Sequence, residues 1–232
     1  MCGRISQSRE PDEYFANIFT NMHGLFSLER PYATHNVPPG SKPLVIHQLT
    51  GEPAIGRWHW QYVPPWAEKK YVTPNATIEK IMSGSNWWAG PLKHGRMIAP
   101  ADGWYEWTGE KPNKQPWYIR PNDGQPLWMA AISGWRADLP WDESEMTSGF
   151  VVVTDQSAGG MVDVHDRRPI ILSTEHAREW MDPATTVAQA KELLSVARPE
   201  SAFEWYEVTK RVGNSNYQGE DSKKPINKNI DN

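Results

Sequence analysis

The sequence predicts an α+β fold, a single domain of many short, mostly antiparallel strands in a barrel-like or bifurcated sheet with helices at its periphery. Three observations support this fold class. The chain has 232 residues, enough for one domain with a full-sized core. Short strand-like runs separated by turn residues fill its middle. Amphipathic stretches of helical period lie near both ends, and no repeat or internal linker interrupts the chain.

The first expected element is a helix over 11–20. Its apolar residues, between Tyr14 and Phe19, recur at helical spacing, and Pro11 suits a first turn. A rigid loop follows at 35–41, where two prolines precede a glycine. Seven strand-like runs come next, at 44–47, 55–63, 96–99, 104–107, 116–120, 127–133 and 150–154.

The turn Asn122-Asp123-Gly124 between two of these runs is typical of a hairpin. A helix is expected over 174–181, begun near Ser173 and stopped by Asp182-Pro183, and a second over 186–197. A last strand is expected over 203–208. The charged, aromatic-free segment 220–232 predicts a disordered tail, which leaves 1–219 as the domain.

Composition excludes several classes of protein. Hydrophobic residues make up 38% of the chain, mean hydropathy is −0.68, and no apolar run approaches the roughly 20 residues of a membrane helix. No signal peptide is visible, and a single cysteine fits a reducing compartment. We therefore expect a monomer in the cytoplasm, in a bacterial cytosol or nucleoid or encoded by a phage, with no membrane contact.

Metal and duplex-binding functions are also disfavoured. One cysteine excludes cysteine-based zinc sites, and the seven histidines form no paired ligand motif, so we expect neither metal nor cofactor. A net charge of −4 argues against a general duplex-binding protein but leaves room for a local basic groove. Six residues are candidates to line one: Arg4, Lys69, Lys70, Arg96, Arg167 and Arg168. The alternative is ordinary solvated surface.

The one cysteine, Cys2, directly follows the initiator Met1. A lone cysteine is usually a small buried hydrophobe. Because the side chain is small, removal of Met1 is expected, which leaves an α-amine and a thiol on one residue. The amine of such a 1,2-aminothiol condenses with an aldehyde. The thiol then closes a five-membered thiazolidine ring in an intramolecular step.

Two polar side chains among apolar neighbours are candidates for chemistry. Asn75 is either a turn residue or a carboxamide that holds an aldehyde or an amine. Glu106 shares a strand face with Trp104. It is either a desolvated general acid–base with a raised pKa or a carboxylate paired with an arginine across the sheet.

A third polar segment spans 162–169. Read as extended chain, it places Val162 and Val164 on one side and His165 on the other. His165 lies among charged residues and suits a proton shuttle near neutral pH. Arg167 or the following arginine either binds phosphate with a bidentate fork or pairs with a nearby aspartate.

Thirteen tryptophans are mostly expected in the core. Trp66, in a loop made rigid by two prolines, is the best candidate to stack on an unpaired base.

Together these segments form an ordered set that resembles the SRAP family, the SOS-response-associated peptidases or abasic-site-processing proteins. The resemblance covers residue 2 to about Gly219. The motifs appear in this order: Met1-Cys2-Gly3-Arg4, Asn-Val-Pro-Pro-Gly at 36–40, Asn75-Ala76 with Glu79, Ala-Asp-Gly-Trp-Tyr-Glu-Trp at 101–107, Val-Asp-Val-His-Asp-Arg-Arg-Pro at 162–169, and Val212-Gly213-Asn214.

The resemblance implies a DNA damage response protein, an enzyme that binds single-stranded DNA and cross-links its abasic sites through a thiazolidine at Cys2. It also implies possible abasic lyase activity and self-removal of the residue before the cysteine. Asn75 is expected to orient the sugar and the N-terminus. Glu106 is expected to act as acid–base, and His165 to hold a sugar hydroxyl or phosphate and assist proton transfer.

The resemblance also implies a DNA-binding set. Arg4 and Arg167 are expected to neutralise flanking phosphates. Asn36 and Pro39 are expected to border the pocket, and Trp66 to wedge against a base.

The sequence departs from the family pattern at two positions, which weakens expected DNA affinity more than chemistry. Thr77 stands where many relatives have a phosphate-binding arginine, and Ala67 replaces the second member of a tryptophan pair. Two rival functions remain. One is an amidohydrolase with Cys2 as N-terminal nucleophile, and the other is a non-catalytic single-strand-binding module.

Overall fold

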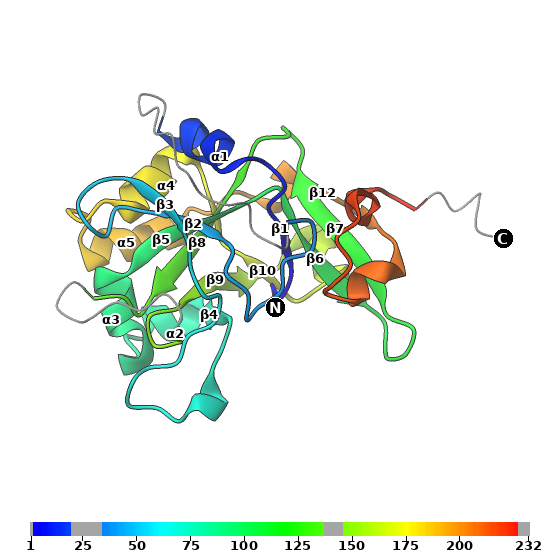
Figure 1. Cartoon of the computed structure of the whole chain (residues 1–232). Coiled ribbons are helices and arrows are strands. Elements are labelled where there is room, and N and C mark those ends of the chain that lie inside the picture. The colour runs from blue at the N-terminus through cyan, green and yellow to red at the C-terminus, as the bar shows by residue number, and fades with distance from the viewer. Residues whose placement is uncertain (1, 20–33, 137–145, 227–232) are drawn as a thin grey trace.

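The computed structural model describes residues 2–19, 34–136 and 146–226, and its strands form two sheets (Figure 1). The larger sheet has the order β10-β9-β8-β5-β2-β3, with β11 beside β8 and β4 beside β9. Its strands are β2 (Leu44–His47), β3 (Ala54–Arg57), β4 (Asn75–Thr77), β5 (Arg96–Ala101), β8 (Leu127–Ser133), β9 (Phe150–Gln156), β10 (Arg167–Pro169) and β11 (Ile171–Leu172). Every pairing is antiparallel except the one between β4 and β9.

The smaller sheet has the order β1-β6-β7-β12. Its strands are β1 (Ile5–Ser6), β6 (Gly103–Thr108), β7 (Gln115–Pro121) and β12 (Phe203–Glu207), all paired antiparallel. The helices are α1 (Pro11–Ile18), α2 (Ile78–Met82), α3 (Asn86–His94), α4 (Thr174–Met181) and α5 (Val187–Ser195). The α+β class is confirmed. Neither sheet closes into a barrel within the described residues, so the barrel-like alternative is wrong.

Both faces of the larger sheet are buried, which is why its strands read as apolar runs. Alternate residues such as Leu44 and Ile46 join a core with α1, α3, α4 and α5. The intervening Val45 joins a second core that includes Ile5 and Trp104 of the smaller sheet. The second core therefore lies between the two sheets, and it contains Cys2.

The chain crosses from the larger sheet to the smaller one between β5 and β6. The Asp102 carboxylate accepts hydrogen bonds from the Ser8 backbone N–H and hydroxyl, from Arg9 Nε and from the Tyr14 hydroxyl. A Cβ on Gly103 would lie 2.4 Å from the Ile119 carbonyl oxygen, so this corner requires glycine. The corner fixes the direction of β6, which carries Glu106.

Several predicted elements are confirmed and others are wrong. The strands at 44–47 and 127–133 and the helix at 174–181 have the predicted bounds. The turn at 122–124 is not a hairpin, because it joins β7 of the smaller sheet to β8 of the larger one. The strand at 55–63 ends at Arg57, and the helices α2 and α3 were not predicted.

The predicted disordered tail is wrong for residues 220–226. A short 3-10 helix, η5, spans Glu220–Lys223, and Ser222 is fully buried. The Tyr206 hydroxyl donates to the Lys223 carbonyl at 2.8 Å. Residues 227–232 lie outside the described residues. None of the described helices is long and apolar enough to cross a membrane.

Candidate active site

Cys2 lies in the segment that leads into β1, and none of its surface is exposed. Antiparallel pairing places Ile5 opposite Trp104, and backbone hydrogen bonds join Ile5 to Val37 on the other side. The N-terminal segment is therefore fixed from both sides. Burial raises the pKa of the Cys2 thiol, and the nearby Glu106 raises it further. The thiol is thus protonated at neutral pH, and its use as a nucleophile requires a base.

Asn75 lies directly against Cys2. The parallel pairing of β4 with β9 places Asn75 opposite Val152, where it is 6% exposed. Its Nδ2 donates to the Cys2 carbonyl oxygen at 2.9 Å. Its Oδ1 is buried and accepts no hydrogen bond from the described residues. Since an unsatisfied buried acceptor costs about 1–3 kcal/mol, this oxygen is suited to receive a donor from a ligand or a processed N-terminus.

Glu106 faces the interior from β6, on the same side as Trp104, as the strand alternation predicts. It is 4% exposed, and burial raises its pKa to about 8. The carboxyl group is therefore mostly neutral at pH 7. Its Oε2 lies 3.8 Å from Nε2 of His165.

His165 follows the 3-10 helix η2 (Gly159–Asp163), so the extended alternation predicted for this segment is wrong. The Arg167 N–H donates to His165 Nδ1 at 3.0 Å, and Asp166 Oδ1 lies 2.8 Å from the same nitrogen. Nε2 is the ring nitrogen that faces Glu106, while Nδ1 lies between the Arg167 N–H and the Asp166 carboxylate. Burial lowers the pKa of His165. A neutral imidazole thus faces a neutral carboxyl group at pH 7.

A cavity of about 570 Å³ lies beside this group, and we call it the Cys2 cavity because the residues that follow Cys2 line it. Its lining includes Glu106 and His165 together with the residues that follow Cys2. The remaining lining residues come from β6, from the β6–β7 turn and from η4 (Lys210–Gly213): Trp107, Lys111, Pro112, Lys114, Lys210 and Gly213. The structure therefore brings together Cys2, Asn75, Glu106 and His165 from four separate parts of the chain.

Three lysines at this cavity were missed by the sequence reasoning. Lys111 and Lys114 lie on the β6–β7 turn, and Lys210 begins η4. The charge of Lys114 is close enough to contribute to lowering the His165 pKa. Two lysines in the turn that directly follows the strand of Glu106 were the signal in the sequence that could have indicated a basic cavity.

Arg4 lies at the cavity wall as part of a fixed network. Its Nη1 donates to Asn36 Oδ1 at 2.7 Å and to the Val212 carbonyl at 3.0 Å, and its guanidinium lies 5.6 Å from the centroid of the Trp107 ring. Asn36 is fully buried, and its Nδ2 donates to three backbone carbonyls between Val212 and Tyr217. The enclosed side chain of Asn36 does not line the cavity itself, and its expected part in DNA binding stays a prediction. Asn36 positions Arg4.

The other predicted DNA-binding residues lie away from the lining of the Cys2 cavity. Pro39 is half-buried. Trp66 is 67% exposed, packs edge-on against Trp87 with centroids 5.3 Å apart, and lines a separate cavity. Arg167 makes a bidentate ion pair with Glu79 at 2.8 and 2.9 Å. The sequence left open whether Arg167 binds phosphate or pairs with a nearby aspartate. In the structure it pairs with a carboxylate, but this is Glu79 and not an aspartate.

The basic groove considered from sequence does not form from the six residues considered. Arg96 is buried, and its guanidinium donates to backbone carbonyls. Lys70 pairs with Glu68 at 2.9 Å, and Arg168 donates to the Arg198 carbonyl. Of the six, only Arg4 lines the Cys2 cavity.

Comparisons with known proteins show the family and the fold. The sequence model of the SOS response associated peptidase (SRAP) family matches residues 1–215. The chain is 36% identical over 228 residues to the abasic site processing protein YedK of Escherichia coli, covering 97% of this chain and all of that one. It is 26% identical to the abasic site processing protein HMCES of Xenopus tropicalis, covering 78% of this chain and 63% of that one.

A solved structure gives the same result. A phage-related protein from Bordetella bronchiseptica superposes with a TM-score of 0.80 at 43% identity, covering 94% of this chain and 99% of that one. A protein from Bacteroides thetaiotaomicron shares the fold, with a TM-score of 0.72 at 20% identity, covering 97% of this chain and all of that one. The chain belongs to the SOS response associated peptidase (SRAP) family.

Proposed function

We propose that this protein captures abasic sites in single-stranded DNA by forming a thiazolidine between Cys2 and the sugar aldehyde. The observation that carries the proposal is a group of four neighbouring residues beside one cavity, of which Glu106 and His165 line the cavity itself. Cys2 lies against Asn75, and Glu106 faces His165 at 3.8 Å. The names of the relatives, abasic site processing proteins, give the substrate class.

The reaction begins with the removal of Met1, which frees the α-amine of Cys2. The buried Oδ1 of Asn75 then accepts a hydrogen bond from that amine and orients its lone pair. The amine attacks C1 of the ring-opened deoxyribose and forms a carbinolamine. Asn75 is thus a positioning residue for the nucleophile.

Glu106 supplies the proton that the carbinolamine needs in order to lose water. With a pKa raised to about 8, the carboxyl group is a proton donor at neutral pH. Loss of water leaves an iminium ion beside a carboxylate. The Cys2 thiol, protonated because burial raises its pKa, then gives its proton to that carboxylate as sulfur bonds to C1. One water leaves overall, and Glu106 ends the cycle protonated.

His165 assists the opening of the sugar ring. The imidazole lines the cavity and 27% of its side chain is exposed, so we assign it to the O4′ that leaves C1 as a hydroxyl. An imine that is not captured by sulfur would undergo β-elimination of the 3′-phosphate. Lyase activity is therefore the side reaction expected when ring closure fails.

The charges at the cavity mouth favour a DNA backbone. Arg4, Lys111, Lys114 and Lys210 line the mouth, and Glu106, mostly neutral at pH 7, is the acidic residue lining the described cavity. The three lysines supply positive charge for phosphate binding. Thr77 is neutral, and the charge of Arg167 is compensated by its ion pair with Glu79. A single strand is favoured because the enclosed Cys2 is reached only by an extruded sugar.

The test is a denaturing-gel assay with an oligonucleotide that carries one abasic site. The wild-type protein is expected to yield a heat-stable adduct with single-stranded DNA, less with duplex, and none with undamaged DNA. Cys2→Ala abolishes the adduct but retains non-covalent binding, and Cys2→Ser, whose amine remains, gives an adduct only after borohydride reduction. An adduct that persists undiminished in Cys2→Ala would refute the proposal. If the wild type forms no adduct and Cys2→Ala binds DNA as well as the wild type does, the non-catalytic binding module is favoured. Hydrolysis of glutamine by the purified protein would favour the amidohydrolase.

A further inference from the structure

The Cys2 cavity has the size of a site for a small molecule. Its volume of about 570 Å³ lies within the range of roughly 300–1,000 Å³ that is typical of small-molecule pockets. None of the surface of Cys2 is exposed, so DNA has to extrude a sugar in order to reach it. A free sugar has no polymer that must stay outside, and condensation of an aminothiol with an aldehyde needs no neighbouring nucleotide. Size and chemistry therefore both fit a free aldehyde of sugar size.

Three lysines determine which charge on such an aldehyde is favoured. Lys111, Lys114 and Lys210 are exposed and line the cavity. Within residues 2–19, 34–136 and 146–226, none of their ammonium groups forms a hydrogen bond or an ion pair. Glu106 is the carboxyl group among the described lining residues, and burial keeps it mostly neutral at pH 7 by raising its pKa to about 8. The lining is therefore cationic and suited to an anion.

A phosphate monoester matches this cluster of lysines. It carries about −1.5 to −2 charges near pH 7, whereas a phosphodiester of DNA carries one. Lysine ammonium groups bind phosphate as point charges, so a higher charge on one phosphate strengthens the contact. An aldose with a phosphate at the end of the chain opposite C1 presents both groups that the proposed reaction uses, an aldehyde and a phosphate.

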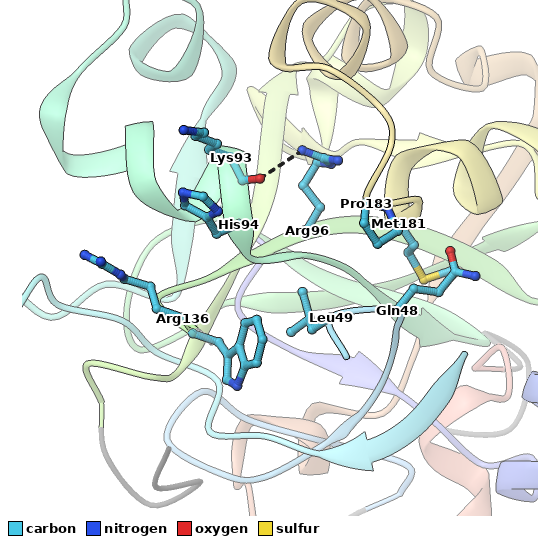
Figure 2. A pocket seen from close by; sticks show the side chains of 9 residues that line it. Gln48, Leu49, Lys93, His94, Arg96, Arg136, Met181 and Pro183 are labelled. Carbon is cyan, nitrogen blue, oxygen red and sulfur yellow. Dashed lines mark hydrogen bonds between the residues drawn. The ribbon is translucent and has the colours of Figure 1, made fainter. Parts of the chain in front are cut away.

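A second cavity, of about 410 Å³, is also basic but does not offer this chemistry (Figure 2). Lys93 and Arg96 are among its lining residues. The Arg96 guanidinium donates to the carbonyls of Lys93 and Trp180, so the fold itself uses its hydrogen-bonding groups. The described lining contains neither a cysteine nor a carboxyl group. Positive charge alone does not capture an aldehyde, and Lys93 therefore provides a control for effects of charge.

A free aldose phosphate reacts by the same steps as an abasic site. The Cys2 amine adds to C1, the C1 oxygen leaves as water after protonation by Glu106, and the thiol sulfur bonds to C1. The thiol proton returns to Glu106, so one water is released. Carbon 3 of the free sugar carries a hydroxyl group, whereas carbon 3 of an abasic site carries a phosphate. Because β-elimination then lacks a good leaving group, the thiazolidine accumulates.

We propose that the Cys2 cavity also captures free phosphorylated aldoses as thiazolidines, and that this capture blocks the site toward DNA. The inference rests on the proposed function for the chemistry at Cys2. Its own argument comes from the size of the cavity and from the three lysines that line it. Aldose phosphates therefore compete with abasic DNA for the same residue.

The test is intact-mass spectrometry of the full chain without Met1 after incubation with 2-deoxyribose 5-phosphate or with 2-deoxyribose. The expected product has the mass of the protein plus that of the sugar, less one water. Cys2→Ala should give no acid-stable product, because an imine hydrolyses in dilute acid. A peptide with the sequence of residues 2–4, Cys-Gly-Arg, measures how fast each sugar reacts with an aminothiol outside the protein. The protein should prefer the phosphorylated sugar at least about tenfold more than the peptide does.

Two pairs of substitutions test the lysines. Lys111→Ala with Lys114→Ala should reduce the preference for the phosphorylated sugar by about tenfold. The matched control is Lys42→Ala with Lys93→Ala, which removes two positive charges from exposed positions outside the Cys2 cavity. The control should change the preference by less than about twofold. All four side chains are exposed, so both variants are expected to fold.

Protein that has first reacted with the sugar phosphate should form almost no adduct with an abasic oligonucleotide. The inference is overturned if the protein prefers the phosphorylated sugar no more than the peptide does, if both pairs of substitutions have equal effects, or if loading leaves the DNA adduct undiminished. Untreated protein that captures the oligonucleotide but not the sugar phosphate would overturn this inference and leave the proposed function standing. Failure to capture either one would overturn both.

Discussion

Replacing Glu106 with glutamine should stabilise the fold at alkaline pH while it slows the chemistry. The carboxyl group is 4% exposed, and burial moves its pKa from 4.5 to about 8. The unfolded chain releases the Glu106 proton near pH 4.5, whereas the folded chain keeps it until about pH 8. The free energy of unfolding therefore falls as pH rises between these values and is constant above them.

The magnitude follows from the same pKa shift. Between these two pKa values, each pH unit lowers the free energy of unfolding by about 1.4 kcal/mol. The total loss by pH 8 is therefore at most about 5 kcal/mol. Glutamine has nearly the same shape and does not ionise. The advantage of Glu106→Gln should therefore grow with pH up to about 8 and then level off.

The assay is urea denaturation of both proteins at intervals from pH 5 to pH 9. In parallel, adduct formation by Glu106→Gln should slow by about 10²–10⁴-fold because the proton donor is lost. A stability difference that does not vary with pH would refute the raised pKa. Equal loss of DNA binding and of chemistry would refute the acid–base role.

Three further variants test the surroundings of the site. Asn36→Ala removes hydrogen bonds to three carbonyls and should lower the free energy of unfolding by about 2–3 kcal/mol in urea titrations; a loss below about 0.5 kcal/mol would contradict the positioning role. Lys111→Ala with Lys114→Ala should lower the salt slope of abasic-site DNA binding by about 1.4 without reducing adduct yield at saturating DNA; an unchanged slope would remove these lysines from the interface. Glu79→Gln frees Arg167 and should steepen that slope by about 0.7 while changing stability by less than about 1 kcal/mol; weaker binding would show that the ion pair supports the DNA surface.

The elements that sequence predicts well are those whose signals are local. Ser173 accepts a backbone hydrogen bond at the start of α4, where the sequence predicts the helix to begin, and Thr186 does the same at the start of α5. The strand at 127–133 is apolar up to its last residue, Ser133, because both of its faces are buried. Such signals lie within the element itself, so they can be recognised without knowing which other element packs against it.

Other features depend on partners that are distant in sequence. The turn at 122–124 has hairpin chemistry, with Gly124 at φ +66°, yet its flanking strands pair in different sheets. The helix α3 contains Pro91, which hides its helical character. The polar segment around Ser222 is ordered by contacts with β12 and with the Tyr105 hydroxyl, 117 positions away.

The residues of the site also fall into those that the sequence predicts and those that only the fold reveals. Cys2, Asn75, Glu106 and His165 stand out because each is a reactive or polar residue in a setting that does not explain it. The lysines of the cavity mouth do not stand out, because an exposed lysine in a turn is ordinary surface until the fold places it. The enclosure of Asn36 does not stand out either, because it depends on backbone carbonyls between Val212 and Tyr217 that are distant in sequence.

Intact-mass spectrometry of the protein after incubation with a single-stranded oligonucleotide carrying one abasic site tests the thiazolidine most directly. The predicted mass is that of the chain without Met1 plus that of the DNA, less one water, and it should be the same with and without borohydride because a thiazolidine is not an imine. The Cys2→Ala protein should give no such species. A mass that includes Met1, or an adduct that gains two hydrogens on reduction, would contradict ring closure by the Cys2 thiol.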